Sequence, residues 1–259
     1  LKDKFNVTGK LKGITVKKKP LLLLENYKYY LQVPSLLYEA NRSIHTFGFL
    51  IFIFNTILVT ASGILIQIFV CSIAAYPLAR LFKKRTANAL LMVFLGCMMI
   101  PFISVMVPQF MMFKDMGLYN NYGALIIPWL IPHGLNVLLF KSFFERLPQS
   151  LFDAVRIDGA TEWYSYIRIC MPLSKSIISI IALSTFLSGW SDFFWPWMVA
   201  QKQNLWTLSV ALYNLSRMDQ VKLNFLMGTS IITILPVILL TIVFSDQIKQ
   251  SLASSGIKG

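Results

Sequence analysis

Five long apolar stretches are the feature that most constrains how this chain can fold. A helix of about 20 apolar residues crosses the ~30 Å hydrocarbon core of a bilayer and satisfies its own backbone hydrogen bonds. Each stretch is long enough for one such helix. The sequence therefore predicts an all-α, polytopic membrane helix bundle over residues 47–246. Its five visible spans are expected at residues 47–79, 87–113, 123–140, 177–200 and 225–244.

The composition supports this class and excludes others. Of the 259 residues, 56% are hydrophobic and 14% are charged, whereas a soluble domain has about a quarter charged residues. Twenty Phe and six Trp exclude a disordered chain. The net charge of +13 would suggest nucleic acid for a soluble protein. In so apolar a chain we expect basic loops beside membrane lipid instead, and no nucleic-acid partner.

Basic residues gather in alternate links between the stretches. Segments 80–86 and 141–176, together with the tail, hold eleven of the 24 Lys and Arg residues. The positive-inside rule places these segments, including the tail 247–259, in the cytoplasm. Residues 1–46 then form an extracytoplasmic segment. Because nothing within the chain would export that segment, we expect an upstream span, which brings the expected total to six spans.

The link 141–176 carries a structured motif. Ser150 and Asp153 form a capping-box pattern, and Gly159 is a natural helix stop, so a helix is predicted over about 151–157. A second helix is predicted from Thr161 to Cys170, ending before Pro172. Both helices have apolar faces. They must therefore bury those faces against the bundle itself or against a soluble partner.

The motif resembles the EAA loop of ATP-binding-cassette importer permeases. That pattern is Glu-Ala-Ala, three residues, Gly, nine residues, Ile, one residue and Leu-Pro. Here Asp153-Ala154-Val155 take the place of Glu-Ala-Ala, Gly159 and Ile169 follow at the same spacings, and Met171-Pro172 take the place of Leu-Pro. The sequence of residues 154–160 is similar to that of the carbohydrate-uptake branch, in particular to its second, maltose-type permease.

The resemblance implies a mechanism and a set of partners. The loop would be a coupling helix that docks on a cytoplasmic ATPase, through Asp153, Ala154, Val155, Asp158, Gly159 and Ala160. Asp153 is expected to cap the helix and could also pair with a basic residue of the ATPase. The importer would further contain a second permease subunit, two cytoplasmic ATPase domains and an extracytoplasmic solute-binding protein. It would reside in the cytoplasmic membrane of a bacterium or archaeon.

Polar and aromatic groups inside the spans are candidates for a substrate pathway. Polar side chains are costly in a bilayer and usually face the bundle interior, and sugars stack on aromatic rings. The same tryptophans could instead form an interfacial belt, and the carboxylate could pair with backbone. The candidates are Asn55, Asn136, Trp190, Asp192 and Trp195.

No catalytic or metal-binding pattern is visible. The chain lacks a phosphate-binding loop, so we expect no cofactor here, and ATP and Mg²⁺ in a separate ATPase. The three cysteines have no metal-ligand spacing and are expected to be small buried residues. The prediction is a non-enzymatic subunit of a sugar importer. Two alternatives stay open: an importer branch for amino acids, phosphate or phosphonate, and an ion-coupled secondary transporter.

Overall fold

The computed structural model describes residues 48–217 and 223–244, and within these ranges the regular structure is entirely helical. The predicted all-α bundle is confirmed. The segment 1–46 and the tail 247–259, to which the sequence assigned opposite sides of the membrane, lie outside the described residues.

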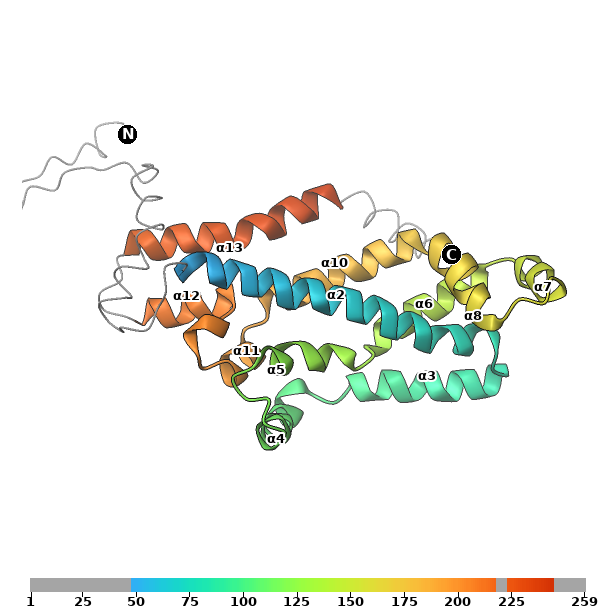
Figure 1. Ribbon diagram of the computed structural model, residues 1–259, viewed down its shortest axis with the longest axis horizontal. Coiled ribbons are helices and arrows are strands. Elements are labelled where there is room, and N and C mark those ends of the chain that lie inside the picture. Colours follow the sequence, from blue (N-terminus) through green and yellow to red (C-terminus); the bar gives the residue numbers. More distant parts are fainter. Residues whose placement is uncertain (1–47, 218–222, 245–259) are drawn as a thin grey trace, which may run out of the picture.

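Helix α2 (Gly48–Arg80) is the central element of the bundle. Its 33 residues include no charged side chain before Arg80, as an uninterrupted membrane helix requires. It packs against α6 (Gly134–Arg146) and α10 (Lys175–Ser191), which lie alongside it in Figure 1. Helix α13 (Leu223–Val243) also runs along the bundle.

Two of the predicted spans are single helices. Helices α2 and α13 are each long and apolar enough to cross a bilayer, and they cover the predicted spans 47–79 and 225–244. Three further helix pairs pass the same test only when each bent pair is taken together, which gives up to five crossings in the described part of the chain. The sequence did not predict where those pairs bend.

The predicted span 87–113 is not one straight helix. Helix α3 (Lys84–Met98) and helix α4 (Phe102–Asp115) meet at 88°. Pro101 lies at the bend with ψ 129°, outside the helical region. Proline has no N–H to continue the helical ladder, and it disfavours a helical conformation in the residue before it. Helix α4 therefore crosses the direction of the bundle and is seen end-on in Figure 1.

The predicted span 123–140 is broken as well. Helix α5 (Tyr122–Ile126) and the 3₁₀ turn η2 (Ile127–Leu130) form its first part, and α6 follows after a bend of 43°. Gln67 of α2 donates its side-chain N–H groups to the carbonyls of Trp129 (2.7 Å) and Ile131 (2.8 Å) at this break. Neighbouring helices commonly satisfy carbonyls that prolines leave free within membrane spans, and Gln67 does so here.

The predicted span 177–200 ends early as a helix. Helix α10 stops at Ser191, because Asp192 adopts an extended conformation with ψ 126°. The short helix α11 (Phe194–Val199), the 3₁₀ turn η4 (Gln203–Leu205) and helix α12 (Leu208–Ser216) follow.

The links sort to the two ends of the bundle as the charge pattern predicts. Helices α7 (Gln149–Ile157) and α8 (Glu162–Ser165) project at the end where α2 finishes and α3 begins. Helices α4, α5, α11 and α12 lie at the other end (Figure 1). The segments 80–86 and 141–176 thus lie at the same end of the bundle.

Candidate functional site

Helix α7 and its C-terminal turn form the centre of the site. The N–H groups of Gly159 and Ala160 donate to the carbonyls of Arg156 and Val155, both at 3.1 Å, which is the Schellman pattern of helix ends. Gly159 has φ +75°, a left-handed conformation that glycine adopts without strain. The predicted helix stop at Gly159 is confirmed, and it makes α7 a short helix with a fixed end.

The start of α7 differs from the prediction. The helix begins at Gln149 after Pro148, and no side chain caps it. The predicted capping by Ser150 and Asp153 is therefore wrong. The Asp153 carboxylate instead accepts a hydrogen bond from the Gln149 side chain one turn earlier, at 3.0 Å. Pro148 explains the earlier start, because its fixed φ suits a helix entrance and no side-chain cap is required.

The second predicted helix is longer and less regular than expected. Thr161 caps α8, accepting from the N–H of Tyr164 at 3.3 Å. The π-helical segment η3 (Tyr166–Cys170) follows, and α9 (Met171–Leu173) continues past Pro172. The predicted end before Pro172 is wrong. A proline ring clashes with the carbonyl four residues earlier in an α-helix, and the wider π-helical turn relieves that clash.

Arg80, the last residue of α2, anchors the base of α7. Its guanidinium lies 4.1 Å from the ring centre of Phe152, which is buried at 2% exposure. It donates to the carbonyl of Phe144, to that of Leu147 at 2.7 Å, and to the Gln149 side chain at 3.0 Å. Arg80 thereby satisfies carbonyls at the end of α6 and fixes the entrance of α7.

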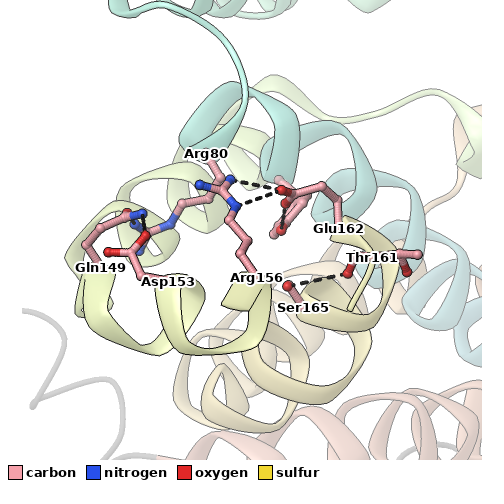
Figure 2. Close-up of polar contacts among 8 residues, drawn as sticks. Arg80, Gln149, Asp153, Arg156, Thr161, Glu162 and Ser165 are labelled. Carbon is pink, nitrogen blue, oxygen red and sulfur yellow. Dashed lines mark hydrogen bonds and ion pairs between the residues drawn. The ribbon is translucent and has the colours of Figure 1, made fainter. Parts of the chain in front are cut away.

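Glu162 joins three elements (Figure 2). One carboxylate oxygen accepts two hydrogen bonds from Arg156 of α7, at 2.9 and 3.0 Å. The other accepts from the Tyr76 hydroxyl of α2 at 2.7 Å. These bonds, that of Tyr76 first, hold the pKa of Glu162 below its ordinary value, and Glu162 raises the pKa of Arg156. The contact is thus complete at neutral pH and would be lost only as the pH falls through the lowered pKa of Glu162.

The outer side of α7 and α8 remains uncovered. Ile157 is 85% exposed, and the side chains of Leu151, Trp163 and Tyr164 are also exposed. Apolar groups that project together from the end of a bundle are typical of a surface that binds another protein. Five of the six predicted coupling residues lie on α7 or in its terminal turn, and the sixth, Ala160, follows directly. Asp153, Ala154, Asp158 and Gly159 are exposed, whereas Val155 and Ala160 are half-buried.

The predicted pathway residues do not form one cluster. Asn55 is fully buried and donates to the carbonyls of Asn204 (2.9 Å) and Trp206 (3.0 Å), while it accepts from the Tyr122 hydroxyl (2.7 Å). Asn136 is buried beside Gln67, to which it donates at 3.4 Å. Asn55 therefore connects α2 to irregular backbone around η4, whereas Asn136 connects α6 to α2.

The remaining three lie around the break between α10 and α11. Trp190 is buried and donates to the Thr233 carbonyl of α13 at 2.9 Å. Trp195 is buried and donates to the Ala124 carbonyl at 2.7 Å. Asp192 is half-buried in the extended turn between them. The structure brings these three to one region, away from α7, and their role in a pathway stays a prediction.

Sequence reasoning missed the residues that hold α7 in place. Tyr76, Arg80 and Glu162 are ordinary residues in their local segments, and their partners lie up to 86 positions away in the chain. One available signal was the spacing of polar residues at the end of an apolar helix, which places Ser72, Tyr76 and Arg80 on one face of α2. No metal-binding cluster of His, Cys, Asp or Glu occurs within the ranges that the structure describes.

The fold defines an integral membrane helix bundle, with the α7 site at the end that carries the basic links. The family described as binding-protein-dependent transport system inner membrane component matches residues 67–250, which is most of the chain. The chain belongs to this family.

Two relatives of this chain are permease proteins of sugar transport systems. The arabinooligosaccharides transport system permease protein AraQ of Halalkalibacterium halodurans is 29% identical over 79% of this chain and 73% of its own length. The melibiose/raffinose/stachyose import permease protein MelC of Bacillus subtilis is 30% identical over 79% of this chain and 75% of its own length. A crystal structure of a bacterial ABC transporter involved in alginate import contains a chain with the same fold, at TM-score 0.67 and 23% identity. That match covers 79% of this chain and 77% of the other.

Proposed function

We propose that this chain is a transmembrane permease subunit of an ATP-driven importer for a carbohydrate, an oligosaccharide or a related sugar. It forms half of the translocation pathway and couples that pathway to a separate ATPase. The observation that carries the proposal is α7, a helix with a fixed C-terminal turn and an uncovered apolar surface at the end of a membrane bundle. Such a helix can transmit a displacement of a soluble partner to the bundle as a rigid element.

The proposed partners follow from the family and from what the chain lacks. A binding-protein-dependent system contains an extracytoplasmic solute-binding protein, and two cytoplasmic ATPase domains supply ATP hydrolysis with Mg²⁺. The sequence has no phosphate-binding loop of its own. A second permease subunit completes the pathway. The basic links at the α7 end support a cytoplasmic location for that end, and the proposed membrane is the cytoplasmic membrane of a bacterium or archaeon.

The proposed substrate class rests on relatives with sugar-import names. Besides the arabinooligosaccharide and melibiose/raffinose/stachyose permeases, these include a lactose transport permease of Rhizobium radiobacter, 25% identical, and a diacetylchitobiose uptake permease of Streptomyces coelicolor, 27% identical. The substrates in the names of these four permeases differ in chain length and in sugar type, and they share hydroxyl-rich rings. We therefore assign the class and not the individual sugar.

Glycine at position 159 offers a direct test of the coupling role. Gly159→Ala forces a left-handed conformation on a residue with a side chain, so the terminal turn of α7 should loosen and retention of the ATPase should fall several-fold. Gly117→Ala is a matched control, because Gly117 also has a positive φ (+72°) and open surroundings, but lies at the opposite end. The measurement is the amount of ATPase that co-purifies with the permease.

A charge reversal provides an independent variant. Asp158→Arg places a cation on the exposed end of α7 and should also release the ATPase, whereas Asp115→Arg makes the same change at the exposed end of α4 and should not. Unchanged retention of the ATPase by both the Gly159 and the Asp158 variants would refute the coupling role of α7.

For the substrate pathway we propose the region around Asp192, with Trp190 and Trp195 beside it and with Asn55 and Asn136 further along the bundle. A half-buried carboxylate at a helix break supports this role, because intramembrane carboxylates usually face a pathway or a partner. The aromatic rings of Phe193, Trp197 and Tyr213 pack against one another directly beside it, at centroid distances from 5.0 to 6.2 Å.

Uptake measurements test this assignment. Asp192→Asn should lower uptake of labelled arabinotriose or raffinose by about tenfold, the usual scale for losing a hydrogen bond to a charged group. The amount of assembled complex should stay the same, and Asp115→Asn serves as the control. Uptake equal to that of the parent would contradict a pathway role for Asp192 and leave it a structural one. Uptake of glutamine, phosphate or a phosphonate instead of either sugar would identify another importer branch.

A further inference from the structure

Three polar residues of α2 contact the α7–η3 segment at successive helical turns. The hydroxyls of Ser72 and Tyr166 are 2.7 Å apart. One turn later Tyr76 donates to Glu162 at 2.7 Å, and after another turn Arg80 donates to Gln149 at 3.0 Å. Because residues four apart share a helix face, the three contacts form a ladder along one side of α2. Figure 2 shows its outer part.

The ladder is built to resist sliding and rotation. Ser72, Tyr76 and Tyr166 are buried, at 0%, 5% and 3% exposure. Breaking such a contact without water to replace it leaves unsatisfied polar groups, which opposes its loss. The Tyr76 ring also lies against the rings of Phe144 and Tyr166. The outermost contact adds the Arg80 guanidinium on the face of Phe152.

The ladder adds a third helix to the path of any force applied to α7. The link that contains α7 is covalently continuous with α6 before it and α10 after it, but not with α2. Further along α2, Gln67 and Asn55 hold the irregular segments of the other half of the bundle through backbone carbonyls. A displacement passed to α2 would therefore reach both halves of the molecule.

We propose that Ser72, Tyr76 and Arg80, with Tyr166, Glu162 and Gln149 as their respective partners, are positioning residues that make α7 and α2 move as one body when the ATPase closes. The proposal rests on the proposed function. Within the loop, the Arg156–Glu162 pair keeps α7 and α8 in register, so Glu162 is the residue at which the ladder and the loop meet.

Distance measurements between spin labels test the proposal in the assembled complex. Labels are placed at Ser150 of α7 and Leu65 of α2, which are both exposed and lie outside the uncovered apolar surface of α7 and α8. The expectation that all three cysteines are buried is wrong for Cys97, which is exposed and is therefore replaced by Ser, whereas Cys71 and Cys170 are buried. Distances are recorded without nucleotide and after trapping with ATP, Mg²⁺ and vanadate. We expect one narrow distribution with the same mean in both states.

Variants of Glu162 identify the contact responsible. Glu162→Ala should broaden the distribution in the trapped state while vanadate-trapped nucleotide stays at the parental amount. Tyr76→Phe removes only the hydroxyl donor and should broaden it as well, whereas Glu162→Gln keeps an acceptor for that hydroxyl and should leave it narrow, a difference that a general folding defect would not produce. Glu145→Ala is the matched control, since it removes a carboxylate that pairs with Lys141 on α6 at 2.6 Å and makes no bond to α2.

Two outcomes would overturn the ladder: a shifted mean distance in the parent after trapping, or a Glu162→Ala distribution as narrow as that of the parent. Failure of the proposed function gives a different result. In that case no ATPase would co-purify and no nucleotide would be trapped in any sample, whereas a failed ladder leaves both intact.

Discussion

Trp129 illustrates how single residues set the spacing of the helices. Its indole lies against two glycines from different helices, Gly63 of α2 and Gly189 of α10. A Cβ atom at Gly63 would approach the indole to 2.8 Å, and one at Gly189 to 3.2 Å. The absence of side chains at these positions therefore lets the turn η2 pack closely against α2 and α10, as small residues commonly do between membrane helices.

We predict that Gly63→Ala destabilises the folded protein by about 1–3 kcal/mol, the usual cost of overpacking. The indole ring is held between helices and cannot move aside cheaply. Gly96→Ala is the control, because no atom lies within 4 Å of a Cβ built there, and alanine favours a helix over glycine by about 0.5–1 kcal/mol. Thermal unfolding in detergent should show a lower Tm for the first variant and an unchanged or higher Tm for the second.

Some residues of the site could be predicted from sequence and others could not. Gly159 could, because a glycine after a short amphipathic helix is a local signal and its left-handed conformation is a local property. Arg80 could not, since its contacts with Leu147 and Phe152 depend on how helices distant in sequence pack together. Asp153 was assigned as a cap from a local pattern, and Pro148 overrode that pattern.

At the scale of elements, hydropathy located the apolar segments and gave little information on their breaks. The bends at Pro101 and between η2 and α6 follow prolines that the sequence displays. Whether a proline bends a helix by 88° or is absorbed, as Pro77 and Pro236 are within α2 and α13, depends on the neighbours that take up the freed backbone groups. The helix α2 supplies several such groups, of which Gln67 is the clearest.

We predict that Gln67→Leu destabilises the break between η2 and α6. The part-buried carbonyls of Trp129 and Ile131 would lose their donors, at a combined cost of about 1–3 kcal/mol. Thr241→Val is the control, because its exposed hydroxyl bonds only to a carbonyl of its own helix. Hydrogen exchange at residues 127–137 should accelerate in the first variant alone. Exchange as slow as in the parent would mean that the break does not depend on Gln67.

At the scale of the whole molecule, the pattern of basic links predicted which segments share an end, and the family resemblance predicted what α7 is for. Neither predicted the connection between α7 and α2, because the ladder involves residues that are common in both soluble and membrane helices. The net charge of +13, which in a soluble chain would have suggested nucleic acid, is explained in part by the basic links at the α7 end of a transport subunit.

The unequal lengths of the helices have a consequence for the lipid around them. At 1.5 Å per residue, the 33 residues of α2 extend about 50 Å, whereas the 17 residues of α10 extend about 25 Å. A bilayer core of ~30 Å is too thin for the first unless it tilts, whereas the second shares its crossing with the segment on the other side of a 76° bend. Membrane thickness should therefore act as a tuning parameter of this protein.

We predict that ATP hydrolysis by the complex, reconstituted in phosphatidylcholines of increasing acyl length, passes through a maximum and declines in the thickest bilayers. Thick bilayers would increase the hydrophobic mismatch at the short helices α3 and α10, whereas α2 could adapt by reducing its tilt. A rate independent of acyl length would show that the mismatch is absorbed by lipid alone. A maximum would mean that the composition of the host membrane is part of the working environment to which this bundle is matched.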